Sequence, residues 1–325
     1  MLRTLLVPLA ALTLVSAPRF APAAGAQASK TLSWTSSTQL DEWSATMGGS
    51  PVPSQYLPKL ELDGTNVRTL EWNDEWLACA DGAPVRLRRK FVELAGTETN
   101  VMKMNGQAVE TVRKASSPLA GCTVLLDERA KPDARRVLEN GECAAEHVAA
   151  LTIDLDLSAF VAGAGESEWT VGLDAFNPFD DGFGGLRWQW DTPSKNTHVD
   201  DAQLVANAEG EWKVKLADTR EVDGRKLAVL ALEGQFKTRC ELDGELEHVP
   251  VASGPTREVS DYKLDVRGEL LWDLKASIPA ACALQGELEF VHVTRTVAET
   301  NGQAAYEQRM RFSGDVALDF RVTPQ

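Results

Sequence analysis

Four segments near the C-terminus alternate between apolar and polar side chains with period two. In each, one face is mostly apolar, the other is mostly charged, and a single glycine lies on the apolar face. The segments are Ala228–Leu242, Tyr262–Lys275, Cys282–Thr294 and Tyr306–Val322, and their glycines are Gly234, Gly268, Gly286 and Gly314. Such alternation is typical of strands with one buried face and one face in water. We predict four long antiparallel strands connected as an up-and-down meander.

The glycines also predict the register of this meander. If they lie directly opposite one another, the hairpin centres fall at Val251, Ser277 and Thr300, all within turn-forming sequence. A glycine inside a strand costs roughly 0.5–1 kcal/mol relative to alanine, so a row of them needs a physical cause. Either the sheet bends sharply along the row, or another group packs against the bare backbone.

Both explanations suit a strongly curved, half-barrel-like sheet. The second predicts a ligand on the concave face, and the candidate residues facing it are the four glycines together with Trp272, Phe290 and Phe312. The ligand would be apolar or amphiphilic, because this face of the strands is apolar.

The rest of the chain is also predicted to be mainly β. Asx-Gly dipeptides favour type I′ hairpin turns, and they occur at Asp63, Asp81, Asn105, Asn140, Asp181, Asp223, Asp243 and Asn301. Strands are predicted at Arg68–Ala78, Val85–Leu94, Asn100–Val112, Leu119–Leu126 and Arg136–Asn140. Helical patterns are few and short, and they are limited to Thr38–Met47, Leu157–Val161 and Asp174–Phe176.

The N-terminus has the layout of a secretory signal peptide. A positive charge at Arg3 precedes the apolar run Leu5–Val15, and Ala26-Gln27-Ala28 fits a small-residue cleavage site. We predict a signal peptide over residues 1–28, an N-terminal β-rich unit over 29–195 and the four-stranded unit over 196–325. No transmembrane segment is predicted after the leader. The mature protein is expected to be exported and soluble, in the periplasm or outside the cell.

Five cysteines leave at least one thiol unpaired. Cys122 and Cys143 are symmetric about the turn-forming residues 131–134, so a hairpin there would bring their Cα atoms within the roughly 7 Å that a bridge requires. These two cysteines are the candidate disulfide.

Cys240 and Cys282 are not expected to pair. The glycine register places Cys240 opposite Tyr262 and Cys282 opposite Trp272, ten residues apart on one strand. That separation corresponds to roughly 33 Å.

Charge and motifs exclude several classes of function. The chain has 33 Lys and Arg against 48 Asp and Glu, a net charge of −15, which disfavours nucleic-acid binding. No nucleotide-binding, zinc-protease or serine-hydrolase motif is present, so no cofactor, metal site or catalytic residue is predicted.

Several individual residues have an ordinary structural interpretation that outweighs a functional one. His292 is predicted to be a satisfied, half-buried histidine, and His248 to lie in a turn. His147 and His198 have acidic neighbours but no metal-site spacing, and Asp174, Asp180 and Asp181 lack the spacing of a calcium loop. Trp188 and Trp190 would point the same way on a strand, which favours core packing over a sugar-stacking platform.

Three short motifs resemble a group of uncharacterised secreted bacterial proteins. They are Ser117–Gly121 followed by Thr123–Leu126, then Gly165–Val171, then Gly268–Leu274. The resemblance implies export and no activity or site residue. The sheet pattern is also loosely similar to the half-barrel of periplasmic lipoprotein carriers, which is an analogy of fold alone.

Three functions stay open. The first is a non-catalytic envelope or extracellular protein acting as a structural or protein-interaction module. The second is a binder or carrier of an apolar or amphiphilic ligand on the concave face, and the third is a secreted hydrolase with a carboxylate pair. The first function requires no particular set of site residues. The protein is therefore more simply interpreted as a non-enzymatic one.

Overall fold

A computed structural model describes residues 17–153, 157–174, 176–180, 185–192, 201–244, 256–296 and 305–325. It contains one antiparallel sheet of fourteen strands, ordered β7-β6-β4-β3-β1-β14-β13-β12-β11-β10-β8, with β2, β5 and β9 paired off this path. The strands are β1 (Ala26–Met47), β2 (Ser50–Pro51), β3 (Leu60–Ala80), β4 (Ala83–Met104), β5 (Gln107–Ser116), β6 (Thr123–Asp127), β7 (Arg136–Asn140), β8 (Glu168–Gly172), β9 (Gln189–Trp190), β10 (Glu209–Val222), β11 (Arg225–Gly244), β12 (Thr256–Asp273), β13 (Ile278–Thr296) and β14 (Tyr306–Pro324). The helices are α1 (Ala145–Ala149) and α2 (Asp201–Ala206), with 3₁₀ turns η1 (Ser54–Tyr56), η2 (Pro132–Ala134) and η3 (Ser158–Val161).

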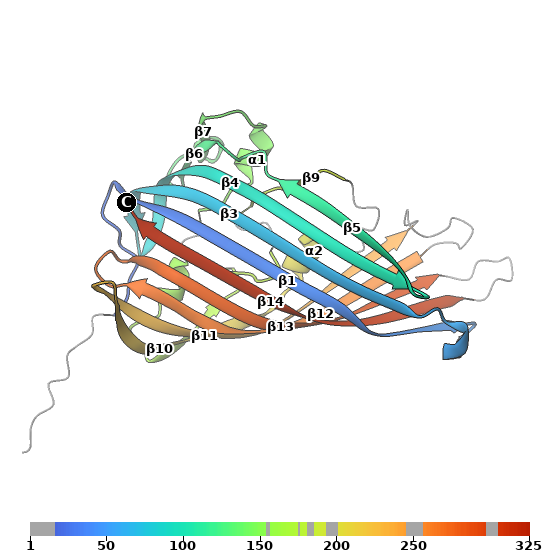
Figure 1. Cartoon of the computed structure of the whole chain (residues 1–325). Coiled ribbons are helices and arrows are strands. Elements are labelled where there is room, and N and C mark those ends of the chain that lie inside the picture. The colour runs from blue at the N-terminus through green and yellow to red at the C-terminus, as the bar shows by residue number, and fades with distance from the viewer. Residues whose placement is uncertain are drawn as a thin grey trace, which may run out of the picture.

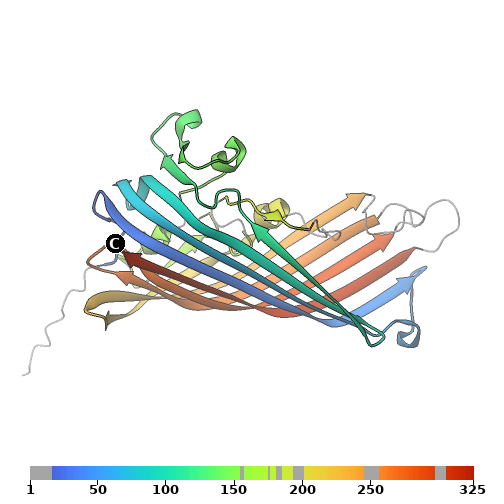
Figure 2. The ribbon, with the colours of Figure 1, turned by 45° about the horizontal axis from the view of Figure 1, so that its top comes forward.

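The predicted fold class is confirmed. The molecule is mainly β, and its long strands curl into a half-barrel that stays open, as Figures 1 and 2 show. The first long strand lies in the middle of the sheet, because β1 pairs with β14 from Ala28↔Pro324 to Met47↔Tyr306 and with β3 on its other side. One sheet therefore runs through both predicted units. Their boundary at residue 195 falls outside the described residues, and the division stays a prediction.

The C-terminal meander is present, but its register differs from the predicted one by two residues. Gly234 pairs with Val266 rather than Gly268, and Gly286 pairs with Val316 rather than Gly314. The three hairpin centres therefore fall at residues 250, 276 and 301, each one residue from the predicted position. Since a shift of two keeps every side chain on its predicted face, the apolar face is unchanged and the glycines form a staggered line.

The same correction applies to two cysteines. Cys240 lies opposite Ser260 and Cys282 opposite Leu270, not opposite Tyr262 and Trp272. The two positions on β12 are still ten residues apart, so the two thiols lie far from bonding distance.

Neighbouring backbone explains why the line consists of glycines. A Cβ atom on Gly268 would lie 1.9 Å from the carbonyl oxygen of Ala283, and one on Gly314 would lie 1.8 Å from that of Ser37. Both oxygens belong to the adjacent strand, which closes in as the strands bend. Gly64 of β3 continues the line, since it pairs with Thr38, which pairs with Gly314. The turn that was expected at Asp63-Gly64 is wrong, because both residues lie within β3.

Two further local predictions are corrected. Thr38–Met47 is not helical but forms the second half of β1, because pairing with β14 along this segment overrides a weak helical pattern. The predicted strand Asn100–Val112 is a hairpin, in which Asn105 (φ 51°) and Gly106 (φ 84°) form the turn between β4 and β5. Asp81-Gly82 and Asp223-Gly224 also turn with positive φ at both residues, as predicted. Leu157–Val161 contains η3, while residues 175, 181–182 and 301–302 lie outside the described residues.

Over one part of the sheet, the apolar face is covered by the chain's own irregular segments. Phe160 of η3 and Phe176 both contact the ring of Trp212 on β10, with centroid distances of 5.6 and 5.8 Å. The indole N–H of Trp212 donates to the carbonyl of Phe176 at 2.9 Å. Residues 157–167 before β8 and Phe176 after it, together called the covering segment, are therefore anchored to the sheet by aromatic contacts rather than by strand pairing.

Residues ahead of β1 complete this core at one end. Phe20 is 2% exposed and makes edge contacts with Trp76 and Trp272, at 6.1 and 6.2 Å between centroids. The indole N–H of Trp272 donates to the carbonyl of Arg19 at 3.2 Å. The signal peptide over residues 1–28 stays a prediction, and cleavage after Ala28 would remove Phe20 from between the two indoles.

Replacing Gly268 with alanine should destabilise the protein. The new methyl would collide with a carbonyl in the neighbouring strand, and such overpacking costs about 1–3 kcal/mol. Urea unfolding followed by tryptophan fluorescence measures the change. The control is Gly165→Ala, where no atom lies within 4 Å of the added Cβ. Equal stability of the two variants would contradict the steric role assigned to the glycine line.

Candidate functional site

The concave apolar face has no room for a ligand where β1, β13 and β14 meet the covering segment. The cavity between them has a volume of about 20 Å³, enough for one water molecule. Its walls are Leu32, Leu157, Phe160, Phe176, Cys282, Leu284, Leu318 and Phe320. Burial raises the pKa of the Cys282 thiol to about 12, so this cysteine is an inert part of the core.

The structure separates the aromatic residues predicted to face a ligand. Trp272 is fully buried beneath Phe20, whereas Phe290 and Phe312 lie toward the other end of the sheet. There the rings of Tyr262, Phe290 and Phe312 stack across β12, β13 and β14, with centroids 5.0 and 4.4 Å apart and interplanar angles of 21° and 8°. Directly opposite aromatic residues stabilise neighbouring strands. The roles of these residues and of the four glycines toward a ligand stay predictions.

An open groove of about 620 Å³ lies over β10–β14, on the part of β12 away from Trp272. Most of its lining comes from the odd-numbered residues of β11–β14, which share the charged face. Five cations line it, namely Lys237, Arg239, Lys263, Arg309 and Arg311, together with three acids, Glu209, Asp261 and Glu289. The lining therefore carries a formal charge of 5 − 3 = +2, in a chain whose net charge is −15.

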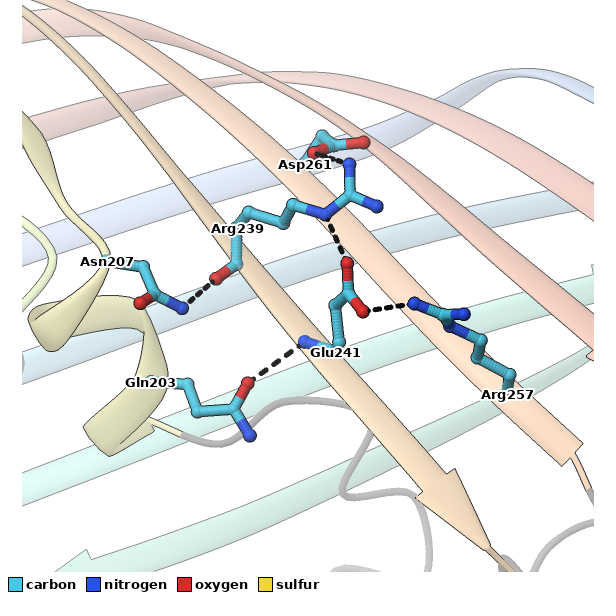
Figure 3. Close-up of polar contacts among 6 residues, drawn as sticks. All are labelled: Gln203, Asn207, Arg239, Glu241, Arg257 and Asp261. Carbon is cyan, nitrogen blue, oxygen red and sulfur yellow. Dashed lines mark hydrogen bonds and ion pairs between the residues drawn. The ribbon is translucent and has the colours of Figure 1, made fainter.

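Cross-strand ion pairs organise one side of the groove, as Figure 3 shows. Arg239 reaches Asp261 of β12 at 3.2 Å and Glu241 of its own strand at 2.6 Å. Glu241 also pairs with Arg257. Hydrogen bonds from Arg257 and Arg239 lower the pKa of Glu241, so its carboxylate stays ionised beside the groove.

Helix α2 covers the edge of β11 beyond the point where β10 begins. The side-chain amide of Asn207 donates to the carbonyl of Arg239 at 2.8 Å, and the backbone N–H of Glu241 donates to the Gln203 side chain at 3.0 Å (Figure 3). The Thr238 hydroxyl donates to the carbonyl of Leu204 at 2.6 Å. These bonds satisfy backbone groups that an edge strand would otherwise expose, and they fix one rim of the groove.

Two of the five cations have no partner among the residues that the structure describes. Lys237 pairs with Glu209 at 2.8 Å and Arg311 with Glu289 at 3.5 Å. Within the described residues, Lys263 and Arg309 form neither an ion pair nor a side-chain hydrogen bond, and both are exposed. Lys263 also lies directly opposite Lys237, and like charges in opposite positions destabilise a sheet.

A second charged cluster is fully buried and joins β1, β3 and β4. Asp74 accepts hydrogen bonds from Lys30 at 2.8 Å, from two nitrogens of Arg89 at 2.7 and 2.9 Å, and from the indole of Trp72 at 3.2 Å. Burial alone would raise the pKa of Asp74, but the charges of Arg89 and Lys30 and their hydrogen bonds outweigh it and lower the pKa to about 2. The cluster is enclosed in the core, and its chemistry is structural.

The predicted interpretation of His292 agrees with its surroundings. Its ring nitrogens lie 2.9 Å from the Ser260 hydroxyl and 3.1 Å from the Thr294 hydroxyl, and Glu258 is 4.0 Å away. Ser260 and Glu258 are 2% and 1% exposed, so this serine and histidine have no opening for a substrate. His198 and His248 lie outside the described residues. In the described ranges no three His, Cys, Asp or Glu side chains are grouped to hold a metal.

Trp188 and Trp190 contact arginines. The guanidinium of Arg68 lies 5.2 Å from the Trp188 ring and 4.8 Å from the Trp190 ring, and that of Arg113 lies 4.3 Å from the Trp190 ring. Arg68 and Arg113 are 2% and 8% exposed. These cation–π contacts hold β9 against β5 and the sheet.

Cys122 and Cys143 lie beside each other as thiols. Burial raises the pKa of Cys143, and the neighbouring Cys122 raises it further. Gly141 leaves space for Cys122, since a Cβ there would lie 2.7 Å from the Cys122 sulfur. A disulfide between the two stays a prediction.

No protein-family model and no curated protein matches the chain. Among solved structures, the chain is similar to the InvG secretin β-barrel of the Salmonella SPI-1 injectisome, at 8% identity over 92% of this chain and 63% of that one, with a TM-score of 0.16. It is also similar to Pseudomonas aeruginosa OccK7, at 8% identity over 92% and 99% of the chains and a TM-score of 0.18. For the type II secretin GspD of E. coli K12 the identity is 9% over 92% and 50%, with a TM-score of 0.17.

At such TM-scores the likeness supports no conclusion about architecture or activity. This chain spans about two thirds or less of the two secretin chains. None of the three structures is a lipoprotein carrier, so they give no support to the likeness to that half-barrel. Among the described residues no helix is long and apolar enough to cross a membrane.

Sequence reasoning missed both charged clusters. Alternation does place Lys237, Arg239 and the facing charges of β12–β14 on one face of the sheet. It does not indicate that this face is hollowed into a groove. The buried cluster also left a signal. Lys30 interrupts the apolar face Ala28–Leu32, and Asp74 stands between two tryptophans.

Replacing Asp74 with asparagine should cost about 3–5 kcal/mol, because Lys30 and Arg89 would lose the charge that compensates them in the core. A native pKa near 2 against 3.8 for the free group means that Asp74 contributes about 2 kcal/mol above pH 4, which is lost as the pH falls toward 2. Urea unfolding at pH 7 and pH 3 measures both effects.

The matched control is Glu61→Gln on the same strand. Its ion pair with Lys103 is exposed and should contribute less than about 1 kcal/mol. If Asp74→Asn were no more destabilising than this control, the buried cluster would not have the structural role assigned to it.

Proposed function

We propose that the protein is a non-catalytic, exported interaction module that binds its partner through the groove over β10–β14. The observation that carries this proposal is the contrast between the two faces of the sheet. The cavity on the apolar face beside Leu32 and Phe320 encloses about 20 Å³, whereas the charged face forms an open groove of about 620 Å³. Binding sites are concave and of several hundred cubic ångströms, a description that fits the groove and not this cavity.

The two alternative functions receive less support. A carrier of an apolar ligand needs an open apolar space, and the covering segment fills the space beside Leu32 and Phe320. A hydrolase with a carboxylate pair needs one acid with a raised pKa. The most deeply buried carboxylate with a resolved shift, Asp74, is held ionised instead.

Export to the periplasm or the extracellular space is part of this proposal. It is supported by the N-terminal sequence pattern.

The charges of the groove are exposed, so salt at physiological ionic strength screens their attraction beyond about 8 Å. A partner must therefore contact the groove closely rather than be held at a distance.

Hydrogen–deuterium exchange with three probes tests which face binds. The probes are poly-aspartate, polygalacturonate and dodecyl maltoside micelles. At least one of the anionic polymers should slow exchange in β11–β14 around Lys263 and Arg309, and the micelles should protect no segment. Protection by micelles on the apolar-face segments, or no protection of the groove by either polymer, would contradict the proposal.

A further inference from the structure

We infer that the groove takes a segment of acidic polypeptide, with aspartate or glutamate side chains bound by Lys263 and Arg309. This inference rests on the proposed function of the groove and names its partner class. The two cations are the starting point, because they are exposed and, among the described residues, have no acidic partner in this chain.

The positions of the two cations set the minimum length of the ligand. Lys263 lies on β12 and Arg309 on β14, two strand spacings apart, or roughly 10 Å across the sheet. Lys263 is in register with Glu289 and so with Ser313, four residues along β14 from Arg309. A single small anion cannot reach both cations, so the ligand presents at least two separated negative charges.

The three carboxylates of the groove decide between kinds of polyanion. Glu209, Asp261 and Glu289 lie among the cations, each engaged by one of them. A polymer with a charge on every unit, such as a polyuronate, would place some of its anions against these carboxylates, which is costly. The rest of the strongly acidic chain repels such a polymer as well.

A polypeptide avoids that conflict. Its acidic side chains are sparse, and its backbone N–H groups can donate to Glu209, Asp261 or Glu289. Val291 in the same lining offers an apolar contact for a side chain between two acids. Charge complementarity therefore selects an acidic protein segment over a uniformly charged glycan.

The test measures binding of a synthetic twelve-residue peptide with the repeat Asp-Gly-Ser to the full chain by fluorescence anisotropy. Wild-type protein should bind it, and binding should weaken as salt is raised. Lys263→Glu and Arg309→Glu should each weaken binding about threefold or more, and the double variant about tenfold. A peptide with Asn in place of Asp should not bind.

Arg267→Glu is the matched control, since Arg267 is an exposed cation on the same face of β12, four residues from Lys263 and outside the groove lining. It should leave peptide affinity nearly unchanged. An equal loss in Arg267→Glu would overturn the inference, because it would show attraction by net charge alone. Binding of polygalacturonate but not of the peptide, lost in Lys263→Glu, would overturn the partner class and leave the proposed function standing. Binding of neither would overturn both.

Discussion

The close approach of neighbouring strands along the glycine line is the constraint on which the rest of this structure depends. At Gly268 and Gly314 the carbonyl of the next strand occupies the volume that any side chain would need. The strands can bend there only because the Cβ atoms are absent. With the bend, strands of about twenty residues curl around a core without closing into a barrel.

Because of the bend, the two faces of the sheet have different surroundings. The apolar face curls around the segments that the chain itself supplies, with Phe160, Phe176 and Phe20 anchored to tryptophans of the sheet. The buried Asp74 cluster joins β1, β3 and β4 beneath the same cover. The charged face is exposed around Lys237, Lys263 and Arg309, and there the groove forms.

Much of the fold could be read from the sequence, since period-two alternation depends on burial alone. It gave the strands of the meander and the face of every residue on them. The register was missed by two residues because the glycines do not lie directly opposite one another, and alternation is the same before and after a shift of two. The helix expected at Thr38–Met47 is wrong because β14 pairs with that segment, and β14 is far from it in the sequence.

The candidate site was harder to predict for a physical reason. A row of charges on a solvated face looks the same whether the sheet is flat or hollowed, and curvature is a property of many strands together. The register is needed to show that Lys263 and Lys237 are neighbours. It is also needed to show that Lys263 and Arg309 have no acidic partner among the described residues. The covering segment was equally hidden, because η3 and the loop to Phe176 have no regular period.

The central claim is that the chain's own segments fill the apolar face beside Leu32 and Phe320, and that a partner binds in the charged groove. Native mass spectrometry of the full-length chain, purified without detergent, tests this most directly. The account predicts a mass equal to that of the polypeptide, with no lipid or other apolar molecule bound. A stoichiometric apolar adduct, retained through purification and released on unfolding, would contradict it.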